Sequence, residues 1–182
     1  MVFARESLVL GAAVMVPVLA YVFRRERFGK FWSISLHASA HRDTTIVFGT
    51  GLFMMAVFLA IYFQEWFVPK YGYGSLRQVM LWAMVMCFAL LAIIPHYDGK
   101  WQGRAHVHIS WAMVVLMPVM LLLHGVHAWG SRGSIVAFSG VFLQGVLLAV
   151  FYGVKGMYER FALMQSLFIA AYFLCVGILG YM

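Results

Sequence analysis

The stretch TTIVFGTGLFMMAVFLAIYFQ, residues Thr44–Gln64, decides the fold class of this chain. It contains no Lys, Arg, Asp or Glu over its whole length. The hydrocarbon core of a bilayer is about 30 Å thick, and an α-helix needs about 20 consecutive apolar residues to cross it. The stretch meets this requirement by itself, so it predicts a transmembrane helix.

Composition extends the prediction to the whole chain. Of the 182 residues, 64% are hydrophobic and only 10% are charged, whereas soluble domains are about 45–50% apolar and about 25% charged. Six apolar runs leave every Lys, Arg, Asp and Glu outside them: 7–23, 44–64, 78–95, 110–129, 133–154 and 161–182. The alternating pattern of a membrane β-barrel does not occur. The sequence therefore predicts an all-α polytopic membrane protein, a six-helix bundle forming one domain over residues 1–182.

The basic residues predict the orientation of this bundle. The first run has one Arg before it and RRERFGK after it, the reverse of a cleavable signal peptide. Nine basic residues fall on one side of the membrane, Arg24, Arg25, Arg27, Lys30, Arg42, Lys100, Arg104, Lys155 and Arg160, and four on the other, Arg5, Lys70, Arg77 and Arg132. The positive-inside rule then places both termini outside, in the plasma membrane. The net charge of +7 is explained by orientation and anionic lipids, so nucleic acid is not an expected partner.

Histidines gather on the predicted cytoplasmic side. The stretch IIPHYDGKWQGRAHVHISW, residues Ile93–Trp111, holds three of the seven, and SLHASAHRD holds two more. If SLHASAH is helical, its histidines at i and i+4 share one face and suit a single metal ion. His106 and His108 would point about 200° apart on a helix, so both face one metal only if helix four begins near Ser110. The candidate ligands of a divalent metal are His37, His41, His96, Asp98, His106 and His108.

Three interpretations of this cluster remain open. A bound metal would activate water, as in a metal-dependent membrane enzyme acting on a lipid. A haem needs two histidines at one depth on different helices, which His41 and either His106 or His108 could supply in an electron carrier. Without a cofactor, the histidines would bind headgroups, backbone carbonyls and water. His124 and His127 lie across the bilayer, about 24 Å of helix away, and cannot join the cluster.

Lys100, Trp101 and Arg104 form a candidate headgroup site within the same stretch. Two basic side chains close together can hold a phosphate, and a tryptophan anchors a loop at headgroup depth. We therefore expect, first, a lipid-interacting membrane protein or an accessory membrane subunit. Its expected partners are membrane lipids and membrane-protein subunits, while the pattern identifies neither a substrate nor a cofactor.

The fifth apolar run contains a stripe of small residues. Gly145, Ala149 and Gly153 recur at four-residue intervals, so they lie on one face of a helix. Small residues let two membrane helices approach closely. We expect a neighbouring helix of the bundle to pack against this stripe.

The order of the polar segments also resembles a known group of proteins. A polar loop with Ser35 and Asp43 follows the first span, the third span ends in AIIPHYD, and the fourth opens with HVHISW. This order is similar to that of the Frag/DRAM/Sfk-type six-helix membrane proteins and their uncharacterised prokaryotic relatives, which commonly have Pro-x-Asp after the third span and a His at the start of the fourth. The matching positions are Pro95, Asp98 and His106 or His108, with two residues between Pro95 and Asp98. The resemblance implies a six-helix bundle connected with lipid or GPI-lipid handling or membrane trafficking.

Overall fold

All regular elements of the computed structural model are helices, within the residues that it describes: 3–25, 33–97, 99–155 and 160–182. Six stretches are long and apolar enough to cross a membrane: α1 (Phe3–Arg25), a rod made of α3 (Arg42–Tyr62), the π-helix η1 (Phe63–Phe67) and α4 (Val68–Tyr71), then α5 (Ser75–Ile93), α6 (Trp101–His127), α7 (Arg132–Gly153) and α8 (Phe161–Tyr181). A short helix, α2 (Ile34–Ser39), lies between α1 and α3. The all-α class and the six long apolar helices are confirmed.

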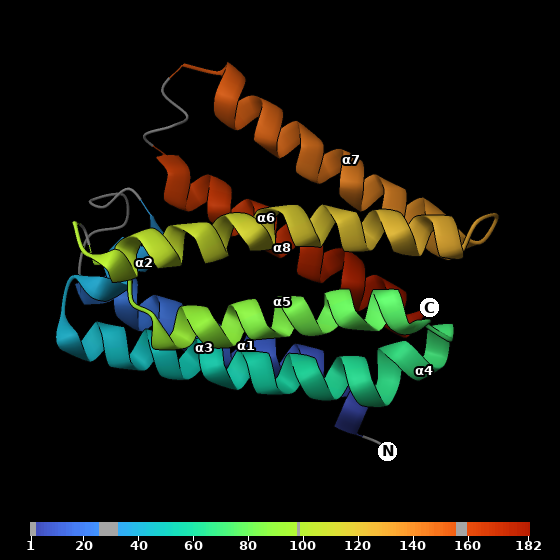
Figure 1. Cartoon of the computed structure of the whole chain (residues 1–182), viewed down its shortest axis with the longest axis horizontal. Helices are drawn as coiled ribbons and strands as arrows, with labels where there is room; N and C mark the ends of the chain where they lie inside the picture. Colours follow the sequence, from blue (N-terminus) through green and yellow to red (C-terminus); the bar gives the residue numbers. More distant parts are fainter. Residues whose placement is uncertain (1–2, 26–32, 98, 156–159) are drawn as a thin grey trace.

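The long helices form a ring. Each packs against the next along the chain, and α8 returns to contact α1. In Figure 1, α2, the last turn of α5, the first turn of α6, the last turn of α7 and the first turn of α8 lie at one end, which we call the α2 end. At the other end, the α4 end, lie α4, the turn between α6 and α7, the first turn of α1 and the last turn of α8. α7 is inclined to the other long helices, and its α2 end stands away from α6 (Figure 1).

The rod that begins with α3 extends to Tyr71, beyond the predicted end of its span at Gln64. The Val68 N–H donates to the Phe63 carbonyl, five residues back, which makes one wide π-helical turn. The following Pro69 explains this turn, because proline has no N–H and its ring crowds the carbonyl four residues earlier. Gly72 then ends the rod in the left-handed region, with φ of 59°.

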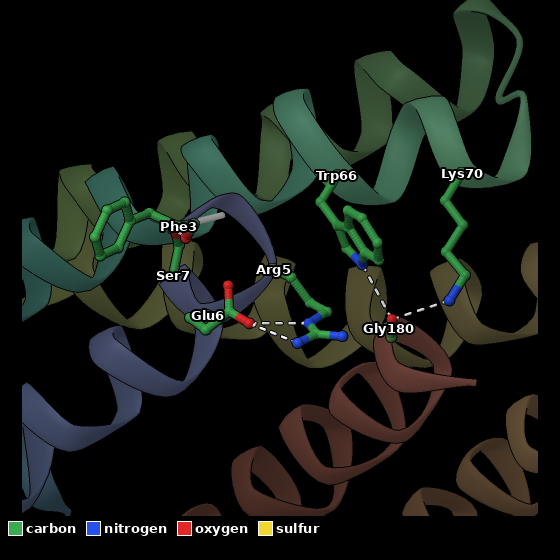
Figure 2. Close-up of polar contacts among 7 residues, drawn as sticks. All are labelled: Phe3, Arg5, Glu6, Ser7, Trp66, Lys70 and Gly180. Atoms are coloured by element: carbon green, nitrogen blue, oxygen red, sulfur yellow. Dashed lines mark hydrogen bonds and ion pairs between the residues drawn. The ribbon is translucent and has the colours of Figure 1, made fainter. Parts of the chain in front are cut away.

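Side chains of this rod bind the end of α8. The last carbonyls of a helix lack partners within the helix. Three donors reach them: Trp66 Nε1 to Gly180 O at 3.0 Å, Lys70 Nζ to Gly180 O at 2.9 Å, and Tyr71 Oη to Leu179 O at 2.6 Å. One turn earlier in α8, the Val176 carbonyl accepts from Tyr62 Oη at 3.0 Å. Figure 2 shows Trp66 and Lys70 meeting at the Gly180 carbonyl, with Arg5 of α1 beside them. The α4 end is therefore closed by hydrogen bonds between helices that are far apart in sequence.

Close approach between helices occurs at other glycines than predicted. Among the described residues, no atom lies within 4 Å of a Cβ built on Gly145 or Gly153, so the predicted packing against the stripe is wrong. A Cβ on Gly140 would instead lie 2.7 Å from Cys175 Sγ and 2.8 Å from Leu121 Cδ1. Gly140 is therefore the residue of α7 that lets α6 and α8 pack close to it.

Candidate ligand cavity at the α2 end

The segment that follows α5 folds back against the first turn of α6. A Cβ on Gly103 would overlap the Tyr97 carbonyl oxygen, so glycine permits this contact. The contact places the His96 ring on that of His106, with centroids 5.3 Å apart and planes inclined by 20°. α6 therefore begins at Trp101 and not near Ser110, because its first turns pack against this segment on one side and expose their polar residues on the other.

His106 connects three elements. Its Nδ1 lies 2.6 Å from the Ile94 carbonyl oxygen, and its Nε2 lies 2.8 Å from Ser35 Oγ. A carbonyl oxygen only accepts, so Nδ1 carries a proton, and Nε2 of the neutral ring accepts the hydroxyl hydrogen of Ser35. His106 thus fastens α2 and the end of α5 to α6.

α2 is held by its own cap and by α8. Ser33 caps the helix, and its Oγ accepts from Leu36 N at 3.2 Å. His37 is buried and its Nδ1 lies 2.9 Å from the Ser33 carbonyl oxygen. The Ile34 N–H donates to Gln165 Oε1 of α8 at 3.4 Å. Together with His106, these contacts fix α2 across the end of the ring.

A cavity of about 360 Å³ lies beside α2, enclosed by the long helices, and we call it the α2-end cavity. Its walls are largely Met, Leu and Phe side chains, including Met55, Met113 and Phe168. Its polar lining residues are Ser33, Ser35, His96, His106, Ser110, Gln165 and Ser166. A second space of about 10 Å³ shares Ser35, His96 and His106 with it and has room for about one water molecule. The cavity is therefore apolar, and its hydrogen-bonding groups come from serine, glutamine and histidine side chains.

The cavity wall includes residues that are exposed on the outside of the ring. Ala12 and Val16 of α1 line the cavity and are exposed, Val16 to 68%. Ala170 of α8 also lines the cavity and is exposed. Trp111 of α6 lines the cavity and is exposed as well, so the cavity wall reaches the apolar outer surface on three helices.

The candidate metal ligands do not lie as the sequence predicts. α2 ends at Ser39 and His41 has extended backbone, with φ of −133°, so the expected helical face shared by His37 and His41 is wrong. His106 and His108 both lie on α6, where His106 is buried and His108 is exposed. The alternative of an extended segment that turns both histidines toward one metal is therefore wrong as well. Asp98 lies outside the described residues. Within the parts of the chain that the structure describes, no three His, Cys, Asp or Glu residues come together to hold a metal ion.

The candidate headgroup residues lie on the outer surface of the α2 end. Lys100 precedes α6 as its N-cap residue and is exposed, with Nζ 5.1 Å from the centre of the Tyr97 ring. Trp101 is 63% exposed and Arg104 is exposed in the first turn of α6. None of these three residues lines the α2-end cavity. They form a separate, basic and aromatic surface.

Two residues of the site were absent from the predicted set. Ser35 appeared in the sequence only as part of a polar loop, and Gln165 lies within an apolar run. A glutamine inside a predicted span is itself a signal, because an amide among apolar residues needs a hydrogen-bond partner. No comparable signal singles out Ser35, whose role depends on the path of the loop.

A different histidine site occupies the α4 end. Burial raises the pKa of Tyr73, so its hydroxyl stays protonated and donates to His124 Nδ1. His124 is buried, and its Nε2 has no hydrogen-bond partner among the described residues. His127 Nε2 lies 2.7 Å from the Tyr71 carbonyl oxygen. These histidines connect α6 to the end of the rod.

Comparison of the chain with protein-family models, with curated protein sequences and with solved structures gives no match.

Proposed function

We propose that this protein is a single-domain integral membrane protein that binds a membrane lipid in the α2-end cavity. The observation that carries the proposal is an apolar cavity whose lining includes exposed residues of α1 and α8. The nine-to-four distribution of basic residues supports a cytoplasmic α2 end, with both termini outside and the plasma membrane as location. The resemblance to the Frag/DRAM/Sfk-type proteins implies the same connection with lipids.

The size and lining of the cavity support a lipid as its occupant. Protein interiors are normally close-packed, and small-molecule sites measure about 300–1,000 Å³ with mainly apolar walls and a few polar groups. At about 360 Å³, the cavity falls within this range. An acyl chain entering beside the exposed lining residues of α1 and α8 would remain in apolar surroundings throughout. The chain would gain packing contacts with side chains such as Met113 and Met117.

The exposed basic surface supports a second contact with lipids. Lys100 and Arg104 flank Trp101 at the α2 end. A basic side chain near an anionic membrane surface contributes about 1 kcal/mol of attraction, and tryptophan prefers headgroup depth. We propose that this surface attracts anionic headgroups around the protein, while the cavity holds the more specifically bound lipid.

Filling the cavity tests the proposal. Met113→Trp places a larger side chain in the cavity wall, whereas Val115→Trp adds the same ring on the exposed side of α6. Native mass spectrometry of the proteins extracted with mild detergent should show a lipid retained by the wild type and by Val115→Trp. Met113→Trp should lose it at unchanged helix content by circular dichroism. Equal retention by both folded variants would rule out the cavity as the lipid site.

A further inference from the structure

We infer that the α2-end cavity selects an uncharged lipid with a hydroxyl head, such as a diacylglycerol, over an anionic phospholipid. This inference rests on the proposed lipid binding and names its ligand class. It follows from the charge of the cavity lining and from the donors and acceptors that the lining offers.

The described lining offers no lysine or arginine to pair with a phosphate. Among the described residues that line the cavity, none is Lys, Arg, Asp or Glu. Taking an ionised group out of water without an opposite charge costs far more than burying a neutral hydrogen-bonded one. The basic residues Lys100 and Arg104 lie on the outer surface and do not line the cavity. A phosphate head would therefore stay outside, whereas a neutral head can enter.

Ser35 offers an acceptor to such a head. Its hydroxyl hydrogen is used by His106 Nε2, because His106 Nδ1 already donates to the Ile94 carbonyl. The lone pairs of Ser35 Oγ remain able to accept a hydrogen bond. The ligand group next to Ser35 should therefore carry a hydrogen, as an alcohol does.

Gln165 and Ser110 offer donors close to Ser35. Gln165 Oε1 accepts from the N–H of Ile34, the neighbour of Ser35, and Nε2 has no hydrogen bond within the described residues. Ser110 follows His106 by one helical turn and lines the same cavity. An amide N–H and a serine hydroxyl can both donate to an oxygen of the head.

A hydroxyl matches this set because it donates and accepts at once. A head with carbonyl oxygens only, such as a quinone, could bind Gln165 but would leave the Ser35 acceptor unmatched. Desolvated polar groups without partners lower affinity, so such a head would bind less well. The volume of about 360 Å³ lies near the lower end of the range for small-molecule sites. The cavity therefore takes the head and the start of the chains, and the remaining methylenes extend past the exposed lining residues of α1 and α8.

Two photoreactive lipids that differ only in a phosphate test the inference. The protein is placed in phosphatidylcholine nanodiscs containing dioleoylglycerol or dioleoyl phosphatidic acid, each with a diazirine in one acyl chain. After illumination, mass spectrometry locates the labelled peptides. Dioleoylglycerol should label cavity residues of α6 and α8, and phosphatidic acid should label only the outer surface. Equal labelling of the cavity by both would overturn the selection of a neutral head but leave lipid binding intact.

Absence of cavity labelling by either lipid would overturn the proposed function itself. Gln165→Met keeps the length of the side chain and removes the amide, so cavity labelling by dioleoylglycerol should fall about three- to fivefold, as expected for one hydrogen bond. Ser110→Ala is a second variant with the same expectation. Gln78→Met removes an amide at the α4 end, where Gln78 Nε2 donates to the Tyr73 carbonyl, and should leave labelling unchanged. Unchanged labelling of folded Gln165→Met and Ser110→Ala would contradict the assigned head contacts.

Discussion

His106 and His124 occupy equivalent positions at the two ends of α6 and yet have different surroundings. They are 18 residues apart, about five turns, so they lie on the same face of the helix. Both are buried. His124 lies among aromatic rings, with its centroid 4.5 Å from that of Tyr71, whereas His106 lies at the wall of the α2-end cavity.

The difference shows that polar side chains have distinct tasks at the two ends. At the α4 end, donors such as Trp66 and Lys70 satisfy the last carbonyls of α8 and leave few polar groups available. At the α2 end, Ser35 and Gln165 are fixed by hydrogen bonds and keep further donor or acceptor capacity toward a cavity. We therefore expect changes at the α4 end to alter stability alone, and changes at the α2 end to alter lipid binding as well.

The largest loss of stability is expected for Gly180→Ala. A Cβ there would overlap the hydroxyl of Tyr62, which is buried and donates to the Val176 carbonyl, so Tyr62 cannot easily move away. Overpacking of this kind lowers stability by about 1–3 kcal/mol. A loss of about 3 kcal/mol should lower the melting temperature in detergent by about 6–12 °C. Gly177→Ala is the matched control, because its Cβ would make an ordinary contact with Leu8 at 3.8 Å. Equal melting temperatures for the two variants would contradict the closed packing of the α4 end.

The number of long helices could be predicted because each apolar run is itself the signal. Their ends could not, since a helix continues wherever its polar residues find partners or solvent. The charged Glu65 ends the apolar run in the sequence, but in the structure the rod continues past it, where Trp66 and Lys70 bind α8. Gly103 likewise extends α6 toward its start, through a contact with Tyr97 that local sequence does not reveal.

The candidate site was predictable only where one residue type carries the signal. His106 stood out as a histidine beside an apolar run, and the structure places it at the cavity wall. Its partner Ser35 is 71 residues away, so their contact depends on how α2 crosses the ring. The cavity could not be predicted, because it is space left between side chains of several helices. The prediction that a helix packs against the stripe at Gly145 was wrong for a similar reason, because small residues in a sequence do not reveal which neighbour faces them.

His106→Ala should have the next largest effect and should change both stability and lipid binding. It removes two hydrogen bonds and leaves the Ile94 carbonyl and Ser35 without their partner. Leaving buried polar groups unpaired costs about 1–3 kcal/mol, so a loss near 2 kcal/mol and a reduced amount of retained lipid are expected. Thermal unfolding and native mass spectrometry measure the two effects. His108→Ala, on the exposed side of the same helix, should change the stability by less than about 0.5 kcal/mol. A larger loss of stability for His108→Ala than for His106→Ala would contradict the role of His106 as the residue that joins the three elements.

Tyr73→Phe should affect stability alone. The substitution keeps the ring and removes the donor to His124 Nδ1, at a cost of about 1 kcal/mol. Lipid retention should match that of the wild type, because Tyr73 and His124 do not line the α2-end cavity. Tyr152→Phe, at an exposed position of α7, is the control for loss of a tyrosine hydroxyl. Loss of lipid from Tyr73→Phe at unchanged stability would show that the two ends are coupled.

Trp66→Phe should have the smallest effect, because the Gly180 carbonyl has a second donor. Lys70 Nζ lies 2.9 Å from the same oxygen and still binds it when the indole N–H is lost. We expect Trp66→Phe to lower the free energy of unfolding by less than about 0.5 kcal/mol. Combining it with Lys70→Met leaves Gly180 O without either donor. The double variant should therefore lose about 1–2 kcal/mol more than the sum of the two single variants. A double-mutant cycle measured by thermal unfolding in detergent gives this coupling. Additive losses would mean that the two donors act independently on α8, and that the α4 end owes its stability to aromatic packing instead of to the capped carbonyls.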